Sequence, residues 1–332
     1  MRTGLPFLLF SALIAGIFFG ELGAMMMPFQ IGTLIDGLDY SESRAGFVGT
    51  METMTLGITM LAISLGAVRL PPRTMAIIGA VMATIGQLLT ALVDVFPVIL
   101  LARFVVGFGS AFCQSAAVIT IASLKNPDST TGFVYAYVIL LLALLVLLVP
   151  WVLPYGYHRA LFALFAVLTV LAIPVIKRLP AENLTTHERV GIARPKGFWL
   201  IVILFFVGEA FLLIGFGSVW SFIERIGVVV GLSPNAVGIA LSMGMLVSMA
   251  GSYSAGYLGV NWGRKLPLVL GALISAVACG AVPLSTSFTS YLLLMFLFQF
   301  MLSFVLPYVV GTSAVLDRSW RVATAAFAVQ IM

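Results

Sequence analysis

Residues 7–29 read FLLFSALIAGIFFGELGAMMMPF, and Glu21 is the only charged residue in that stretch. A helix needs about 20 apolar residues to cross roughly 30 Å of hydrocarbon, so the stretch is long enough to span a membrane. It is also longer than the apolar core of about 7 to 15 residues that is typical of a signal peptide. We therefore predict a membrane helix that the protein retains, with an acid inside it.

The composition of the whole chain agrees with this first stretch. Hydrophobic residues make up 61% and charged residues 9% of the 332 positions, far from the roughly 45–50% and 25% of soluble domains. The apolar runs are continuous, unlike the short alternating segments of a membrane β-barrel. The sequence predicts an all-α polytopic membrane protein with about eleven transmembrane helices. Ten are expected at residues 7–29, 46–68, 74–93, 95–119, 132–153, 159–176, 198–221, 236–259, 266–285 and 290–311, and another opens near 322.

The basic residues indicate how the chain is oriented, because cytoplasmic loops carry an excess of Lys and Arg. With a cytoplasmic N-terminus, thirteen of the 17 basic residues fall inside. These are Arg2, Arg69, Arg73, Lys125, Lys177, Arg178, Arg189, Arg194, Lys196, Arg264, Lys265, Arg318 and Arg321. Only Arg44, Arg159 and Arg225 fall outside, and Arg103 lies in a span. We expect a multi-pass protein of the plasma membrane, the inner membrane of a bacterium, and the charge of +5 does not indicate nucleic acid.

A polar segment at residues 177–197, KRLPAENLTTHERVGIARPKG, follows the sixth predicted helix. We interpret it as a cytoplasmic linker between an N-terminal six-helix bundle, residues 1–176, and a C-terminal bundle, residues 198–332. The alternative is a long loop within one domain. Because the eleventh span is cut off at Met332, we expect the second bundle to be incomplete and the chain to be unstable or inactive without further sequence.

The two halves repeat one another. FFGE at 18–21 and FFVGE at 205–209 place Glu21 and Glu209 at an offset of 188, and 40–49 matches 232–241 at an offset of 192. The offset of 192 also pairs Arg73 with Lys265 and Gly79 with Gly271. Two halves in the same orientation are typical of transporters built from parallel repeats.

One loop carries a resemblance to a known family. GYLGVNWGRK at 256–265 resembles the loop motif of the major facilitator superfamily, in which a glycine ends one helix and a G-R-K cluster starts the next. The matching residues are Gly256, Leu258, Gly263, Arg264 and Lys265, whereas Val260 stands at the motif's acidic position.

Two further stretches are similar to motifs of that family. SLGAVRLPPR at 64–73 keeps Arg69 and Arg73 but has Val68 at the acidic position, and in LLARFVVGFGSAF Arg103 is followed by the family's glycine pattern. The fifth predicted helix lacks the glycine-proline motif that marks many antiporters of the family. The resemblance covers the whole chain.

The resemblance implies a secondary transporter that moves a small organic solute by alternating access, and we expect it to be coupled to protons and to act as a monomer in the bilayer, without a cofactor or metal. It also implies that the first, fourth, seventh and tenth helices line a central cavity, which would place Glu21, Arg103 and Glu209 around it. Gln114 and Gln299 fall on the same helices and are candidates for contact with substrate.

Charges inside a membrane need a reason, because an ionised acid at the centre of a helix costs about 2.5–3.5 kcal/mol on insertion scales. In one interpretation, Glu21 and Glu209 bind protons or a cationic substrate, and movement of Arg103 switches a carboxylate between loading and release. In the other, Arg103 forms a structural ion pair with Glu21 or with Glu52. Glu52 is a weaker candidate for coupling, because its side chain could instead extend outward to the membrane surface.

Two other classes of protein remain as alternatives. An intramembrane enzyme is disfavoured, because His158 and His187 lie outside the predicted spans and neither HExxH nor GxSxG occurs. A truncated, non-transporting, receptor-like protein is the other alternative.

Gly16 with Gly20, and Gly244 with Gly251, are interpreted as sites of close helix packing.

Overall fold

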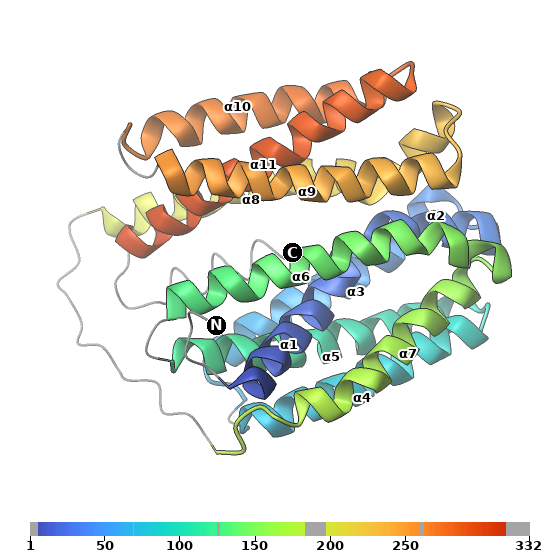
Figure 1. The fold of residues 1–332 in the computed structure, drawn as a ribbon, viewed down its shortest axis with the longest axis horizontal. Coiled ribbons are helices and arrows are strands. Elements are labelled where there is room, and N and C mark those ends of the chain that lie inside the picture. Colours follow the sequence, from blue (N-terminus) through green and yellow to red (C-terminus); the bar gives the residue numbers. More distant parts are fainter. Residues whose placement is uncertain (1–5, 69, 125–126, 183–196, 259–261, 317–332) are drawn as a thin grey trace. The chain divides into compact units, whose positions relative to one another are not determined.

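The computed structural model describes residues 6–68, 70–124, 127–182, 197–258 and 262–316. The regular structure within these ranges is helical, and ten of the described helices are long and apolar enough to cross a membrane (Figure 1). The predicted class, an all-α polytopic membrane protein, is confirmed. The span expected near 322, most of the expected linker and Arg69 lie outside the described residues.

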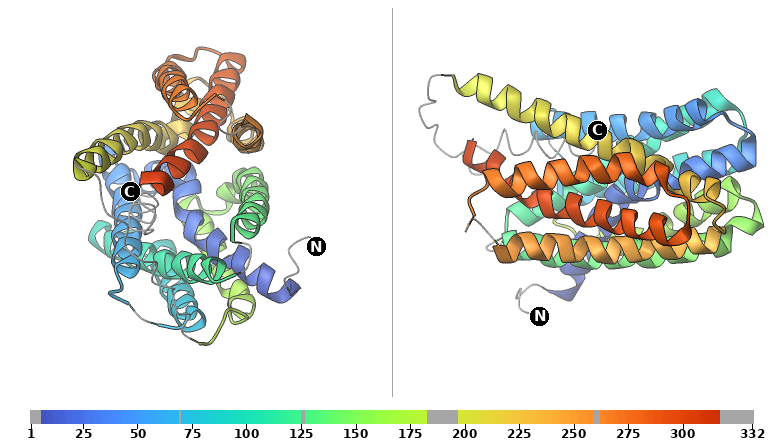
Figure 2. Two further views of the ribbon diagram at one scale, coloured as in Figure 1. Left: turned by 90° about the vertical axis from the view of Figure 1, so that its left-hand side faces the viewer. Right: turned by 90° about the horizontal axis from the view of Figure 1, so that it is seen from above.

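The chain divides into two compact units between α7 and α8, and Figure 2 shows the helices of each from two further sides. The first unit contains α1 (Phe7–Met25), α2 (Met27–Leu38), α3 (Glu42–Ser64), α4 (Pro72–Leu92), α5 (Phe96–Ala122), α6 (Pro127–Val152) and α7 (His158–Ile176). The second contains α8 (Phe198–Val229), α9 (Pro234–Leu258), α10 (Lys265–Ala281) and α11 (Phe288–Leu316). The limits of the linker at 177 and 197 stay a prediction.

The first predicted span differs from what is found, because two helices replace one. α1 stops at Met25 and α2 runs on to Leu38, nine residues beyond the expected end at Phe29. Pro28 explains the break, since it has no N–H to donate to the carbonyl four residues earlier. α2 ends where Asp39 takes a left-handed backbone conformation, with φ of 51°.

The lead helices of the two units match closely. α1 and α2 contain 19 and 12 residues, which with the residue between them make 32, and α8 contains 32. Each carries two acids 15 positions apart, Glu21 and Asp36 in the first unit and Glu209 and Glu224 in the second. α8 is unbroken because the position that corresponds to the proline of α2 holds Phe216.

Helix contacts repeat at the offset of 192 as well. A Cβ on Gly79 of α4 would lie 2.8 Å from the Cβ of Phe112 on α5, and one on Gly271 of α10 would lie 3.5 Å from Cδ1 of Phe304 on α11. Phe112 and Phe304 are themselves 192 positions apart. The repeat inferred from the first three helices of each half therefore extends to the fourth.

These two glycines should be necessary for packing. We expect Gly79→Val and Gly271→Val to lower the free energy of unfolding by about 1–3 kcal/mol each, because overpacking forces the neighbouring helices apart. Gly280→Val is the matched control, since a Cβ there would meet no atom within 4 Å. Thermal unfolding of the purified proteins in detergent measures the difference, and an equal loss in the control would contradict the packing explanation.

Candidate functional site

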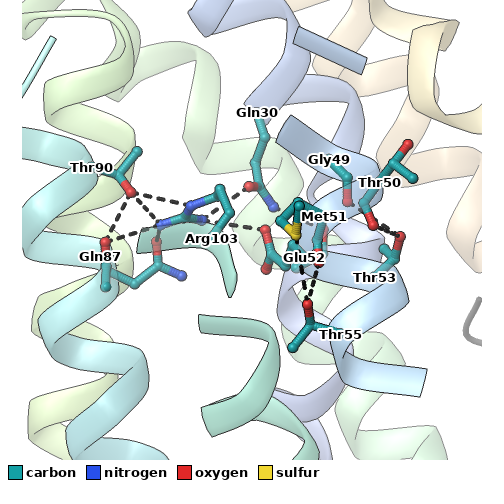
Figure 3. Close-up of polar contacts among 12 residues, drawn as sticks. Gln30, Gly49, Thr50, Met51, Glu52, Thr53, Thr55, Gln87, Thr90 and Arg103 are labelled. Carbon is teal, nitrogen blue, oxygen red and sulfur yellow. Dashed lines mark hydrogen bonds and ion pairs between the residues drawn. The ribbon is translucent and has the colours of Figure 1, made fainter. Parts of the chain in front are cut away.

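Arg103 on α5 lies at the centre of a buried polar network. Its side chain is fully buried, and its Nη2 donates to Thr90 Oγ1 at 2.7 Å and to Gln87 Oε1 at 2.9 Å (Figure 3). On the opposite side, Nη1 donates to Gln30 Oε1 and to Glu52 Oε2, both at 3.3 Å. The network joins α2, α3, α4 and α5. An arginine with this many acceptors is the arrangement that a buried cation requires.

The ring of Phe162 on α7 adds a fifth helix to this network, because the guanidinium carbon lies 4.5 Å from the ring centroid. A cation over an aromatic face is attracted by the ring quadrupole. Arg103 on α5 therefore contacts four other helices of the first unit, α2, α3, α4 and α7.

Glu52 on α3 is the counterion of Arg103. Its side chain is only 1% exposed, so it does not extend outward to the membrane surface. A Cβ on Gly23 of α1 would overlap Glu52 Oε1, and Gln30 donates to the carbonyl oxygen of Gly23 at 2.9 Å. Of the two structural pairs expected for Arg103, the structure contains the one with Glu52.

Glu21 on α1 belongs to a second cluster. Its Oε1 accepts a hydrogen bond from Gln114 Nε2 on α5 at 2.7 Å, and Tyr135 on α6 lies near both side chains. A Cβ on Gly20 would overlap the Cβ of Gln114, so the glycine allows the glutamine to approach α1. Among the described residues, the contacts of Arg103 do not include Glu21. Glu52 is buried and Glu21 is part-buried, and the two acids have different partners.

The second unit contains one acid that was expected and one that sequence reasoning missed. Glu209 and Glu224, both on α8, are 4% and 6% exposed. The seventh span was predicted to end at residue 221, which placed Glu224 in an external loop with Arg225. The internal repeat could have pointed to Glu224, because Glu224 follows Glu209 at the same spacing as Asp36 follows Glu21.

The second unit does not repeat the ion pair. At the offset of 192, Glu52 corresponds to Gly244 and Arg103 to Met295. A Cβ on Gly244 would overlap the methyl carbon of Met295 and lie 3.3 Å from Cγ of Gln299, which is 6% exposed. A packed glycine and methionine thus occupy the place of a charged pair. Gly244 has the packing role that the sequence suggested.

The structure describes part of the two loop motifs, at residues 64–73 and 256–265. Arg73, at the start of α4, donates from Nε to the carbonyl oxygen of Leu179 and from its backbone N–H to that of Pro180, both at 2.9 Å. It therefore ties α4 to the segment after α7. Gly263 has φ of 68°, which glycine adopts without strain. Arg264 and Lys265 follow it and are exposed, and Gly256 lies within α9.

His158 was expected outside the spans but is the first residue of α7 and is only 3% exposed. Its Nε2 lies 3.3 Å from Asp94 Oδ1, and Arg159 donates to the other oxygen of the same carboxylate. This cluster fastens the start of α7 to the connection between α4 and α5.

Comparison with known proteins decides the family. The sequence profile of the Major Facilitator Superfamily matches residues 8–332. The chain belongs to the Major Facilitator Superfamily. It is a transporter and not an enzyme, as the sequence motifs indicated. No curated protein sequence matches this superfamily member.

Solved structures of transporters share its fold. A D-xylose-proton symporter matches with a TM-score of 0.79 and 16% identity, over 97% of this chain and 86% of that one. A bacterial homologue of the human lysosomal transporter Spinster, inward-facing and unoccupied, matches with a TM-score of 0.74 and 19% identity, over 98% and 78%. The xylose transporter XylE from E. coli, partially occluded and inward open, gives 0.73 and 15%, over 97% and 88%. Likeness at such identities shows a common fold.

The ion pair of Arg103 can be tested by removing each partner. Glu52→Gln strands an arginine that keeps its charge, and we expect a loss of about 3–5 kcal/mol in the free energy of unfolding. Arg103→Met should cost less, because the remaining Glu52 can take up a proton and become neutral. Combining the two changes should recover part of the loss. Thermal unfolding and abundance in the membrane measure these effects.

Thr53→Val is the control for the ion-pair variants, because the Thr53 hydroxyl bonds only within its own helix, to Gly49 and Thr50. The interpretation is wrong if Glu52→Gln is as stable as this control, or if the double variant is as unstable as the sum of the two single ones.

Proposed function

We propose that this transporter moves a small organic solute by alternating access, driven by a proton gradient, and that Glu21 is its proton site. The observation that carries the proposal is the difference between the two acids of the first unit that lie inside membrane helices, Glu21, which is part-buried, and Glu52, which is buried. Glu52 contacts a cation, whereas Glu21 accepts a hydrogen bond from a neutral amide.

The physical argument starts from the cost of a charge in an apolar medium. A buried carboxylate is tolerated when a cation offsets it, and otherwise protonation is favoured. Arg103 offsets the charge of Glu52, so that acid has no need of a proton. Among the described residues Glu21 accepts from an amide donor and not from a cation, so its ionised and protonated forms are closer in free energy. An acid of this kind can take up a proton on one side of the membrane and release it on the other.

Glu209 is the second coupling residue in this proposal. It is buried at the position of the second unit that corresponds to Glu21. Gln299, buried on α11, is proposed as a substrate contact. The symporter with the same fold is described as carrying D-xylose with protons, which supports a small solute and proton coupling as a class.

The proton role of Glu21 predicts a specific failure. Glu21→Gln keeps the shape of the side chain and mimics its protonated form, so proton-driven accumulation should be lost while exchange of solute down its gradient continues. Glu209→Gln should likewise separate coupling from solute binding. Both are measured in proteoliposomes, with a solute identified from the growth of a knockout strain on a panel of compounds.

Glu182→Gln is the matched control for these two variants, because Glu182 is an exposed acid beyond α7. Normal pH-driven accumulation by the Glu21 and Glu209 variants, at normal abundance, would refute the proposed coupling.

We further propose a cytoplasmic N-terminus in the plasma membrane, on the basis of the thirteen basic residues that this orientation places inside. In a background without Cys113 and Cys279, single cysteines at Asn183 and Lys265 should be shielded from an impermeant thiol reagent in intact cells. A cysteine at Asp39 should react. Labelling of Asn183 from outside would contradict the orientation.

A further inference from the structure

Gln114 has an unusual hydrogen-bonding position. It is 1% exposed, and its Nε2 donates to Glu21 Oε1. Its own Oε1 is buried and has no hydrogen-bond partner in the part of the chain that the structure describes. Buried side-chain oxygens are rarely left in this state, because an unmade hydrogen bond of a buried group is costly.

The chemistry of the two side chains explains why Oε1 of Gln114 has no hydrogen-bond partner among the described residues. An ionised carboxylate only accepts hydrogen bonds, so it pairs with the N–H end of a glutamine. A protonated carboxyl gains an O–H donor, which the N–H end cannot accept but the carbonyl end can. The observed orientation of Gln114 satisfies an ionised Glu21, and only the reverse orientation lets Gln114 accept a hydrogen bond from the O–H of a protonated one.

We propose that Gln114 is a positioning residue whose side-chain amide rotates by half a turn when Glu21 takes up a proton. This rotation couples α5 to the protonation state of Glu21. With Glu21 ionised, Nε2 donates to the carboxylate. When Glu21 takes up a proton, the amide turns and Oε1 accepts from the new O–H group. The inference rests on the proposed role of Glu21 as proton site.

Gly20 leaves room for the side chain of Gln114 against α1. A Cβ on Gly20 would lie 2.8 Å from the amide carbon Cδ of Gln114, so the missing side chain is what leaves room for the amide. The half-turn exchanges an oxygen for an NH2 group at the buried end. The group that Gln114 offers to its other neighbours thus changes from an acceptor to a donor when Glu21 is protonated.

The titratable and charged groups near this cluster are few among the described residues. Tyr135 on α6 faces both Glu21 and Gln114. Glu52 and Arg103 face Gly23 of α1 and Gln30 of α2 and neutralise one another. Gln114 is hydrogen-bonded directly to Glu21. Uptake of a proton by Glu21 is therefore the change of charge that acts directly on Gln114.

The test is infrared difference spectroscopy of the full chain in bilayers, titrated with acid and without solute. With isotope-labelled glutamine, the side-chain amide band should change in step with the appearance of protonated carboxyl. Gln114→Met, which has similar length and no amide, should lose that amide change completely. Thr120→Val on the same helix should keep it, because the Thr120 hydroxyl bonds to the carbonyl of Ala116 within α5.

Each outcome decides a different question. If Glu21→Gln abolishes the carboxyl signal and native Gln114 shows no amide change, the inference about Gln114 is wrong while the proton site stands. If Glu21→Gln leaves the carboxyl signal intact, the proposed proton site itself is wrong. If Gln114→Met does not fold, the labelled native protein compared with Glu21→Gln still decides, because the amide change must vanish with Glu21.

Discussion

The charge of Arg103 is the constraint on which the first unit depends. Arginine stays protonated in proteins, so a fully buried guanidinium has to be matched by acceptors from its neighbours. Glu52, Gln30, Gln87 and Thr90 supply them from three helices. Close helix approach makes these contacts possible, since a Cβ on Gly107 of α5 would overlap the backbone oxygen of Glu52.

This arrangement distinguishes an acid that is paired with a cation from an acid that is paired with an amide. Glu52 is bonded to a permanent cation, whereas Glu21 is bonded to an amide that can serve either protonation state. The second unit keeps the acid that corresponds to Glu21 but replaces the ion pair with Gly244 and Met295. The duplicated acid and the unduplicated ion pair indicate that the two halves share the position of an acid and differ in how their cores are held together.

Much of the fold could be predicted from the sequence, because hydrocarbon thickness fixes span length and the positions of Glu21 and Glu209 reveal the repeat. The partner of Arg103 could not. Glu21 and Glu52 were both expected as possible partners, because a residue's place along a span does not fix how the helix is rotated about its axis. Glu224 was missed because the end of the span was set where the apolar run ends, at residue 221. The helix itself continues to Val229.

The most direct test of the central claim is to identify which buried carboxyl takes up a proton. Infrared difference spectra between high and low pH, recorded for the native protein in bilayers and for Glu21→Gln and Glu52→Gln, assign the band of the protonated acid. The account predicts that the band disappears with Glu21→Gln and persists with Glu52→Gln. A band that persists without Glu21 and disappears without Glu52 would show that the proton binds at the ion pair, and would contradict the account.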